Sequence, residues 1–422
     1  MIQNTTHLCN EKTKNALDIL DAGLQAALPE RLADLIGQNT LVVGNKSYSL
    51  SKRGKIYVVS VGKAADSMAK TICSKLKADG GIIVVPKNYD STFKNSKFKI
   101  HHASHPIPDK SSVLAAKSIL NLLQNADKND FVLFLISGGA SALVCLPEGI
   151  SLAQKQEMTK LVLKCGATID EINCIRKHLS AIKGGKLIQN LSCQAVSLVM
   201  SDVVGNDLAS IASGLTYFDN STFSDCMRII EKYRLAKKTP SSVLKRFKLG
   251  VDGRVSETPK KPKILNFIVA TNNDCVSAMT KKATSLGYKT KTLAPISGDV
   301  DVVAKKILQN FSNRKKSCLV FGGEPTVRVT GRGKGGRNQE LVLRILQNLD
   351  DDSVIVASVG TDGVDGNTKY AGAISGFVPN KNEIATYLKE NNSCAFFKKH
   401  KGLILTGPTH TNLMDVGLIM RS

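Results

Sequence analysis

The chain has 422 residues, of which 42% are hydrophobic, so it is too long for one ordinary domain and apolar enough for two cores. Its formal net charge is +23, but lysines scattered over the whole chain, without a basic tail and with few aromatic side chains, argue against nucleic acid as a partner. The ten cysteines contain no C-x-x-C pair, so neither a zinc knuckle nor a disulfide framework is indicated.

No apolar run approaches the roughly 18 residues that a membrane helix needs, and residues 1–14 lack an Arg-rich amphipathic face. The sequence therefore predicts a cytoplasmic protein without membrane contact and with reduced thiols, and it leaves a mitochondrial location open.

The first half of the chain has the pattern of a mostly parallel, helix-covered sheet, in which short apolar runs alternate with helical periods. An amphipathic helix is expected over 15–28. Strands are expected over 55–61, 81–85, 99–103, 131–136 and 195–200, and helices over 152–164, 170–188 and 221–233.

Residues 250–263 are polar, with Gly, Pro, Ser and several lysines, and this composition is typical of a linker. Beyond it, strands are expected over 264–270, 288–293, 318–321, 354–359 and 403–405, and helices over 274–286, 300–311 and 338–349. The sequence thus predicts two α/β domains, residues 11–249 and 264–422, the second being the smaller.

The passage 321–340 concentrates glycines and cationic side chains and suits an anionic ligand. Gly322 and Gly323 end an apolar strand, and four further glycines would let the backbone approach a ligand. The cations are Arg328, Arg332, Lys334 and Arg337. A helix from Asn338 would point its N-terminal N–H groups at the same anion, for which phosphate is the natural candidate.

Two other turns follow apolar strands. Gly62-Lys63-Ala64-Ala65 offers room above a helix N-terminus and a point charge, and it fits either a phosphate site or close helix-on-strand packing. Ser137-Gly138-Gly139-Ala140-Ser141 could form an anion nest. Neither string is a Walker A loop or the Gly-x-Ser-x-Gly elbow of a hydrolase.

Aspartates also stand at strand ends, namely Asp202 and Asp207 after one strand and Asp362 and Asp365 after another. Mg²⁺ takes one or two such oxygens together with phosphate, although helix capping or turn formation is an equally good interpretation of any single one. The spacing excludes an EF-hand. The histidines of 101–105 precede two prolines and lack helical spacing, which favours a pinned loop over a metal site.

Gly331-x-Gly333-x-x-Gly336 formally matches the dinucleotide fingerprint and supports an alternative, an NAD(P)-dependent hydroxypyruvate reductase with Asp362 as the acid at the next strand end. The match is weak because Arg332, Lys334 and Arg337 bring more positive charge than a pyrophosphate loop needs.

Taken in order, the motifs resemble the class of glycerate kinases whose C-terminal half is the MOFRL domain. The strings that carry the resemblance run from about residue 10 to 420 and are Gly62-Lys63-Ala64-Ala65, His105-Pro106-x-Pro108-Asp109, Ser137-Gly138-Gly139, Arg176-Lys177-His178-Leu179-Ser180 with Lys183-Gly184-Gly185, Ser201-Asp202-Val203, Ile211-Ala212-Ser213-Gly214, Gly322-Gly323-Glu324, Gly335-Gly336-Arg337-Asn338-Gln339-Glu340, Gly360-Thr361-Asp362-Gly363-x-Asp365-Gly366 and Thr406-Gly407-Pro408-Thr409-x-Thr411-Asn412.

The resemblance implies ATP-dependent phosphorylation of D-glycerate with Mg²⁺, in a cleft between a Rossmann-like N-terminal domain and a smaller C-terminal one. It favours the 2-hydroxyl as acceptor and leaves a monomer and a homodimer equally open. By resemblance, Lys63 and Arg337 face each other across this cleft and stabilise the transferred phosphoryl group, and a point charge and a bidentate fork do suit its oxygens.

The remaining candidate roles are divided by chemistry. Ser137, Gly138, Gly139, Ser141, Gly335, Gly336 and Asn338 are expected to bind phosphate or nucleotide. Arg176, Lys183 and Glu324 are expected to bind substrate, the two cations through its carboxylate. Asp202 and Asp207 are expected to act in catalysis and Asp362 and Asp365 to bind metal, although the sequence alone does not assign one role to each aspartate.

The sequence departs from the family pattern at Ala140, Asn206, Leu215, Lys369 and His410, of which Ala140 and His410 stand where glycine is usual. Ala140 would cost little unless its φ is positive, whereas His410 could crowd a phosphate loop. These changes leave a third alternative open, an anion- or nucleotide-binding protein with weakened catalysis.

Overall fold

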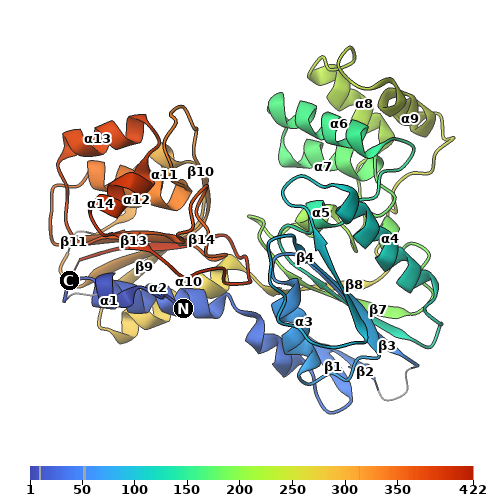
Figure 1. The fold of residues 1–422 in the computed structure, drawn as a ribbon, viewed down its shortest axis with the longest axis horizontal. Coiled ribbons are helices and arrows are strands. Elements are labelled where there is room, and N and C mark those ends of the chain that lie inside the picture. The colour runs from blue at the N-terminus through green and yellow to red at the C-terminus, as the bar shows by residue number, and fades with distance from the viewer. Residues whose placement is uncertain (9–10, 51–53, 313, 422) are drawn as a thin grey trace. The chain divides into compact units, whose positions relative to one another are not determined.

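The computed structural model describes residues 1–8, 11–50, 54–312 and 314–421, and the chain divides into two compact units (Figure 1). The parallel-sheet unit comprises Glu30–Val269, and the mixed-sheet unit comprises Met1–Pro29 together with Ala270–Ser422. Among the described residues, no helix combines the length and the apolar character needed to cross a membrane.

The parallel-sheet unit is built on six strands in the order β5-β4-β3-β6-β7-β8. Their bounds are β3 Ile56–Val61, β4 Gly80–Pro86, β5 Phe98–Ala103, β6 Phe131–Ile136, β7 Gln194–Met200 and β8 Leu265–Ala270. Neighbours from β5 through β7 pair in parallel, and every residue of β6 is buried, as expected for a strand covered on both faces. The predicted Rossmann-like sheet is therefore confirmed.

The helices of this unit lie on the sheet or form a separate helical region. Their bounds are α3 Ala65–Cys73, α4 Lys110–Gln124, α5 Ala140–Leu143, α6 Leu152–Lys164, α7 Ile169–His178, α8 Phe223–Lys232 and α9 Ser241–Val251, with 3₁₀ turns at Pro29–Leu35, Lys186–Ile188 and Ile211–Ser213. A small hairpin, β1 Thr40–Val43 with β2 Lys46–Ser49, was not predicted from the sequence.

The helical region α6–α9 has a hydrophobic core of its own, and α6, α7 and α8 each begin with a capping box. The single helix predicted over 170–188 is wrong in extent, because α7 ends at His178. Gly184 and Gly185 follow with φ of 62° and 83°, a left-handed conformation that a helix does not continue through.

The polar segment 250–263 is not the linker that its composition predicts. Glu257 accepts a hydrogen bond from the Phe223 N–H (2.8 Å), and the Thr258 hydroxyl donates to Asp219 (3.1 Å), so the segment packs on the helical region. The following strand β8 joins the parallel sheet. The boundary between the units thus falls near residue 270, after the expected position at 264.

The mixed-sheet unit has six strands in the order β13-β12-β11-β14-β10-β9. Their bounds are β9 Lys289–Asp299, β10 Ser317–Thr326, β11 Val354–Gly360, β12 Gly372–Ser375, β13 Leu403–Ile404 and β14 Asp415–Arg421. Only β9 and β10 pair in parallel; β14 lies between β10 and β11 and is antiparallel to both. The strands β12 and β14 were missed from the sequence.

Helices cover both faces of this sheet. Figure 1 shows α1, α2 and α10 on one face and α11 to α14 on the other. Their bounds are α1 Thr5–Leu8, α2 Lys14–Ala26, α10 Asn272–Ser285, α11 Val300–Asn310, α12 Arg337–Gln347, α13 Lys381–Lys389 and α14 Ser393–Lys399.

The N-terminal helix α2 belongs to the mixed-sheet unit, whereas the sequence placed residues 11–29 with the first domain. Gly23 of α2 approaches α10 so closely that a Cβ there would lie 2.6 Å from Met279, and Thr411 donates to the Ala27 carbonyl (2.6 Å). The amphipathic pattern showed that α2 needs an apolar partner, but it could not show which unit provides it.

Candidate functional site

Two strand-end turns of the parallel-sheet unit lie side by side. Because β3 and β6 are parallel neighbours, their carboxyl ends meet at one edge of the sheet. The Lys63 N–H donates to the Gly138 carbonyl (2.8 Å), and the Ala64 N–H donates to the Ser137 hydroxyl (3.0 Å). Gly139 has φ of 84°, and a Cβ there would lie 3.4 Å from Cγ of Lys63. The structure thus brings together Lys63 and the Ser137–Gly139 turn.

The hydroxyls of the two serines in the second turn, Ser137 and Ser141, form hydrogen bonds within the protein. Ser137 is buried, and its hydroxyl is engaged with Ala64, while the Ser141 hydroxyl lies 2.9 Å from that of Ser213. Ala140 begins α5 and is not among the residues with positive φ, so its replacement of a glycine carries no backbone cost.

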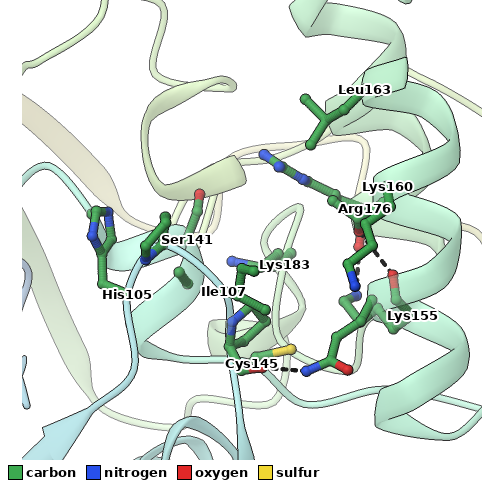
Figure 2. A pocket seen from close by; sticks show the side chains of 15 residues that line it. His105, Ile107, Ser141, Cys145, Lys155, Lys160, Leu163, Arg176 and Lys183 are labelled. Atoms are coloured by element: carbon green, nitrogen blue, oxygen red, sulfur yellow. Dashed lines mark hydrogen bonds between the residues drawn. The ribbon is translucent and has the colours of Figure 1, made fainter. Parts of the chain in front are cut away.

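A cavity of about 400 Å³ opens beside this turn, entirely within the parallel-sheet unit. Figure 2 shows Lys155 and Arg176 on the side of α6 and α7, His105 and Ser141 opposite them, and Lys183 in the middle. Four lining side chains carry a positive charge, namely Lys155, Lys160, Arg176 and Lys183. Among the described residues that line the cavity, none is a carboxylate.

Burial shapes the charges of this cavity. Lys183 is 1% exposed and Lys155 4%, and burial lowers the pKa of Lys183 to about 7 and that of Lys155 to about 8, with neighbouring cations adding to the effect. Burial also lowers the pKa of Arg176. Ammonium groups held without a carboxylate partner favour the entry of an anion, which would restore their charged forms.

The two buried lysines have different hydrogen-bonding surroundings. Lys155 donates to the carbonyls of Arg176 (2.9 Å) and Leu179 (2.7 Å), and it thereby fixes the end of α7. Lys183 donates to the Ala212 carbonyl at 3.4 Å, which is long for a charged donor. Lys183 is therefore the better placed of the two to bind a ligand, while Lys155 was missed from the sequence.

The backbone beside Lys183 is held in uncommon conformations. The N–H groups of Gly184 and Gly185 donate to the carbonyls of Ser213 (3.1 Å) and Gly214 (2.8 Å). The motif Lys183-Gly184-Gly185 therefore lies against the motif Ile211-Ala212-Ser213-Gly214. Ala212 and Ser213 have φ of 52° and 56°, in the left-handed region that non-glycine residues avoid. Backbone strain of this kind is typical of functional sites.

The aspartates after β7 do not line the cavity. Asp207 is exposed and accepts hydrogen bonds from the Ala209 N–H (3.1 Å) and the Ser210 hydroxyl (2.7 Å), an arrangement that forms a turn. Asn206 has φ of 57°, a conformation that asparagine tolerates. Asp202 is half-buried at the end of the strand.

Arg337 is the first residue of α12 in the mixed-sheet unit, and its guanidinium is held by two carboxylates. Nε and Nη2 donate to Asp415 (2.5 and 3.1 Å), and Nη1 donates to Glu324 (2.6 Å). Burial alone would lower the pKa of Arg337, but Asp415 and Glu324 raise it above its ordinary value. Burial raises the pKa of Asp415 to about 7, against the opposing effect of Arg337. Asp415 was missed from the sequence.

The N-terminus of α12 is capped from within the protein. Asp365 is buried and accepts the N–H groups of Asn338 (3.0 Å) and Gln339 (2.9 Å). Burial raises the pKa of Asp365 to about 6, and these hydrogen bonds oppose the shift. The Asn338 side chain accepts the Ser358 hydroxyl (2.6 Å). The prediction that free N–H groups of this helix face an anion is therefore wrong for these two positions.

The glycines of 331–336 allow other segments of the same chain to pack closely against them. A Cβ would lie 2.3 Å from the Glu390 backbone at Gly331, 2.4 Å from Asn392 at Gly333 and 2.3 Å from Asp365 at Gly336. At Gly335 it would lie 2.1 Å from the Ser393 hydroxyl. Close packing of chain segments therefore explains why these positions are glycines, without the close approach of a ligand that the sequence suggested.

The other departures have local explanations. His410 has φ of 59°, which accounts for the expectation of glycine there. Leu215 is buried, and the Lys369 ammonium lies over the Tyr370 ring, 5.7 Å from its centroid. Asp362 is half-buried and accepts the Val364 N–H (3.1 Å).

Comparisons with known proteins agree along nearly the whole chain. Residues 15–248 match a domain of unknown function (DUF4147), and residues 317–415 match the MOFRL family. A glycerate 2-kinase of Pyrococcus horikoshii is 39% identical over 95% of this chain and 97% of its own. A D-glycerate 2-kinase of Thermotoga maritima is 36% identical over 96% and 98%, and a human glycerate kinase is 33% identical over 91% and 87%.

Solved structures give the same result. A crystal structure of a glycerate kinase from Thermotoga maritima superposes with a TM-score of 0.82 at 32% identity, covering 97% of this chain and 99% of its own. A crystal structure of a Pyrococcus horikoshii protein gives a TM-score of 0.80 at 37% identity, with 96% and 97% covered.

Proposed function

The chain belongs to the MOFRL class of glycerate kinases, and we propose that it transfers the γ-phosphoryl group of ATP to D-glycerate, with the 2-hydroxyl as acceptor. The observation that carries the proposal is the cavity of the parallel-sheet unit, which gathers four cations and, among the residues that the structure describes, no carboxylate. Glycerate is a small carboxylate with two hydroxyls, and an anion of this size suits a cavity of about 400 Å³.

Arg176 and Lys183 bind the glycerate carboxylate in this proposal. The Arg176 guanidinium presents a planar fork that matches a carboxylate, and the Lys183 ammonium adds a point charge at a buried position. Lys155 acts indirectly, because its bonds to the carbonyls of Arg176 and Leu179 set the position of the helix end that carries Arg176.

Lys63 and Arg337 serve the phosphoryl group. Phosphoryl transfer depends on positioning both reactants and on neutralising the charge of the phosphoryl oxygens, for which a lysine and an arginine are suited. The Gly138–Gly139 turn, packed against Lys63, supplies backbone to the same group. Asp415 and Glu324 orient the Arg337 fork, so Glu324 acts on Arg337 instead of binding substrate directly.

The reaction also takes Mg²⁺ with ATP in this proposal. Carboxylate oxygens are the ligands that Mg²⁺ prefers, so the aspartates fit the ion chemically. Asp202 and Asp362 are the first choices, because both are half-buried at strand ends, whereas Asp207 is exposed and Asp365 is buried under the N-terminus of α12. The ion would neutralise phosphate charge as the phosphoryl group moves.

The reductase alternative is not favoured. The glycines of its fingerprint pack against Glu390, Asn392 and Asp365, and the named relatives are kinases. An assay with D-glycerate and Mg-ATP, run beside one with hydroxypyruvate and NADH, separates the two activities: ADP formation supports the kinase, and NADH oxidation without ADP refutes it. Nucleotide binding without either turnover would indicate a binding protein.

The role of Lys63 is tested by Lys63→Met. Losing one preorganised charge at the phosphoryl group should lower kcat about 10²- to 10³-fold, with the glycerate KM changed far less. Lys70→Met is the matched control, because Lys70 is an exposed lysine on the adjacent helix α3. Equal turnover of the Lys63 variant and the control would rule out the assigned role.

A further inference from the structure

Three buried side chains of the kind that bind metals meet in the helical region, outside the cavity. Cys174 and His178 lie one turn apart on α7, and Cys226 faces them from α8. One donor atom from each lies within 4.8 Å of the other two, and the two sulfurs are 3.4 Å apart. All three are buried, at 4%, 0% and 0% exposure.

The histidine is oriented as a metal-binding histidine would be. Its Nδ1 lies 2.9 Å from the Cys174 carbonyl, which can only accept, so the proton is on Nδ1. In the neutral ring, Nε2 then has a lone pair, yet it lies 3.1 Å from an oxygen of Glu257, also an acceptor. Two acceptors at this distance require either a proton or a metal cation between them.

We propose that Cys174, His178 and Cys226 bind one Zn²⁺ ion, and that Glu257, whose carboxylate lies 3.1 Å from His178 Nε2, closes on the ion as the fourth ligand. Thiolates with an imidazole select zinc over Mg²⁺ or Ca²⁺, and four protein ligands make a closed, structural site. Zinc bonds of about 2.0 Å to nitrogen or oxygen and 2.3 Å to sulfur imply donor separations of roughly 3.3–3.8 Å in a tetrahedron. The observed 3.4 Å between the sulfurs and 3.1 Å between His178 and Glu257 lie near this range, whereas separations of up to 4.8 Å within the group must shorten when the ion binds.

The surroundings suit the charge of such a site. When both thiols release their protons, two thiolates, a carboxylate and Zn²⁺ leave one net negative charge. Lys260 lies 3.3 Å from the Glu257 carboxylate, and Arg246 donates to the His178 carbonyl (2.9 Å). The Phe223 ring packs edge-on against His178 at 4.6 Å between centroids. Lys260 thus offsets the one negative charge of the site, and an aromatic ring packs against its histidine.

The proposed ion would connect three segments of the helical region, namely α7, α8 and the polar segment 250–263, which contains Glu257. Arg176 lies between Cys174 and His178 on α7, so the ion would also fix the helix that forms one wall of the cavity. This inference stands on the ligand geometry and does not depend on the proposed reaction.

The test is the zinc content of the intact chain, expressed with added zinc and purified without chelator. Elemental analysis should find about one zinc per chain in the wild type and a loss of most of it in Cys226→Ser and His178→Gln. Cys165→Ser is the matched control, because Cys165 lies in the same region and its thiol donates a hydrogen bond to the Val162 carbonyl (3.2 Å). Zinc at background in the wild type, or unchanged in Cys226→Ser, would overturn the proposal.

A second measurement needs no variant. The zinc-free wild type titrated with Co²⁺ should develop thiolate-to-cobalt charge-transfer absorption and the visible bands of tetrahedral cobalt, and added Zn²⁺ should abolish both. A Co²⁺ spectrum typical of octahedral oxygen ligands would refute thiolate coordination. A Cys174–Cys226 disulfide in protein purified under reducing conditions would do the same, since it leaves no thiolate for the metal.

Discussion

Replacement of Lys183 by methionine should make the protein more stable and less able to bind glycerate. Lys183 is 1% exposed, its ammonium has one long hydrogen bond, and no carboxylate lines its cavity among the described residues. Methionine keeps the length of an unbranched side chain and removes the buried charge. The substitution therefore separates the cost of holding the charge from its use in binding.

The size of the effect follows from the pKa of Lys183, which burial lowers from 10.5 to about 7. At about 1.4 kcal/mol per pKa unit, a charged Lys183 opposes folding by about 5 kcal/mol below pH 7. As pH rises from about 7 to about 10.5, the unfolded chain holds a proton that the folded chain has lost, so this penalty shrinks. It should be about 2 kcal/mol near pH 9.

The assay is urea unfolding of the wild type and Lys183→Met at about pH 6 and about pH 9, with the glycerate KM measured in parallel. The variant should be the more stable at both pH values, by a margin that is larger at the lower one. Its KM should rise about 10- to 100-fold, as expected for a lost charged hydrogen bond. Lys164→Met, an exposed lysine on α6 outside the cavity, controls for a general effect.

Two results would refute this reasoning. A Lys183→Met variant that is less stable than the wild type at pH 6 would mean that the ammonium is compensated inside the protein. A stability difference that stays constant between the two pH values would mean that Lys183 does not titrate in this range.

Three further predictions concern the mixed-sheet unit. Arg337→Lys should lower kcat about 100-fold, measured by ADP release, because lysine cannot form the fork held by Asp415; near-wild-type turnover would contradict this role. Asp365→Ala should lower the free energy of unfolding by about 1–2 kcal/mol through loss of the α12 cap, whereas Asp362→Ala, which loses a turn hydrogen bond from the Val364 N–H, should lower kcat and shift the urea midpoint less. The reverse pattern would exchange the roles of the two aspartates. His410→Gly should raise stability by about 0.5–1 kcal/mol, because φ of 59° strains a non-glycine residue; a lower urea midpoint would argue against strain.

The strand bounds of the parallel sheet could be predicted to within about one residue, because most of its strands are short apolar runs bounded by Gly, Ser, Pro or Asp, but the last strand, β8, was assigned to the second domain. The mixed sheet could be predicted only in part. The strand β14 pairs with β10 and β11, which precede it by tens of residues, and local patterns carry no information on such partners. For the same reason, the amphipathic pattern of α2 predicted a helix but not the unit that it joins.

The cations of the cavity were partly visible in the sequence. Arg176 and Lys183 were predicted from their motifs and do line the cavity. Lys155 was missed, although it stands with Met158 and Val162 on the buried face of α6, where a lysine is out of pattern. Asp415 similarly stands at the edge of the apolar run 416–420. A charged residue on a face that the periodicity assigns to the core is therefore a usable signal for a site residue.

The glycine-rich passage before α12 shows why a motif can identify a family without identifying its ligand contacts. Gly331, Gly333 and Gly336 leave space that other parts of the same chain fill, and the N–H groups of Asn338 and Gln339 are satisfied by Asp365. What these constraints fix is the position of Arg337, the first residue of the helix, whose guanidinium is then aligned by Asp415 and Glu324. The glycines act on the chemistry through Arg337, so substitutions at Gly331 should lower stability and kcat together, whereas Arg337→Lys, which keeps a positive charge facing Asp415, should lower kcat far more than stability.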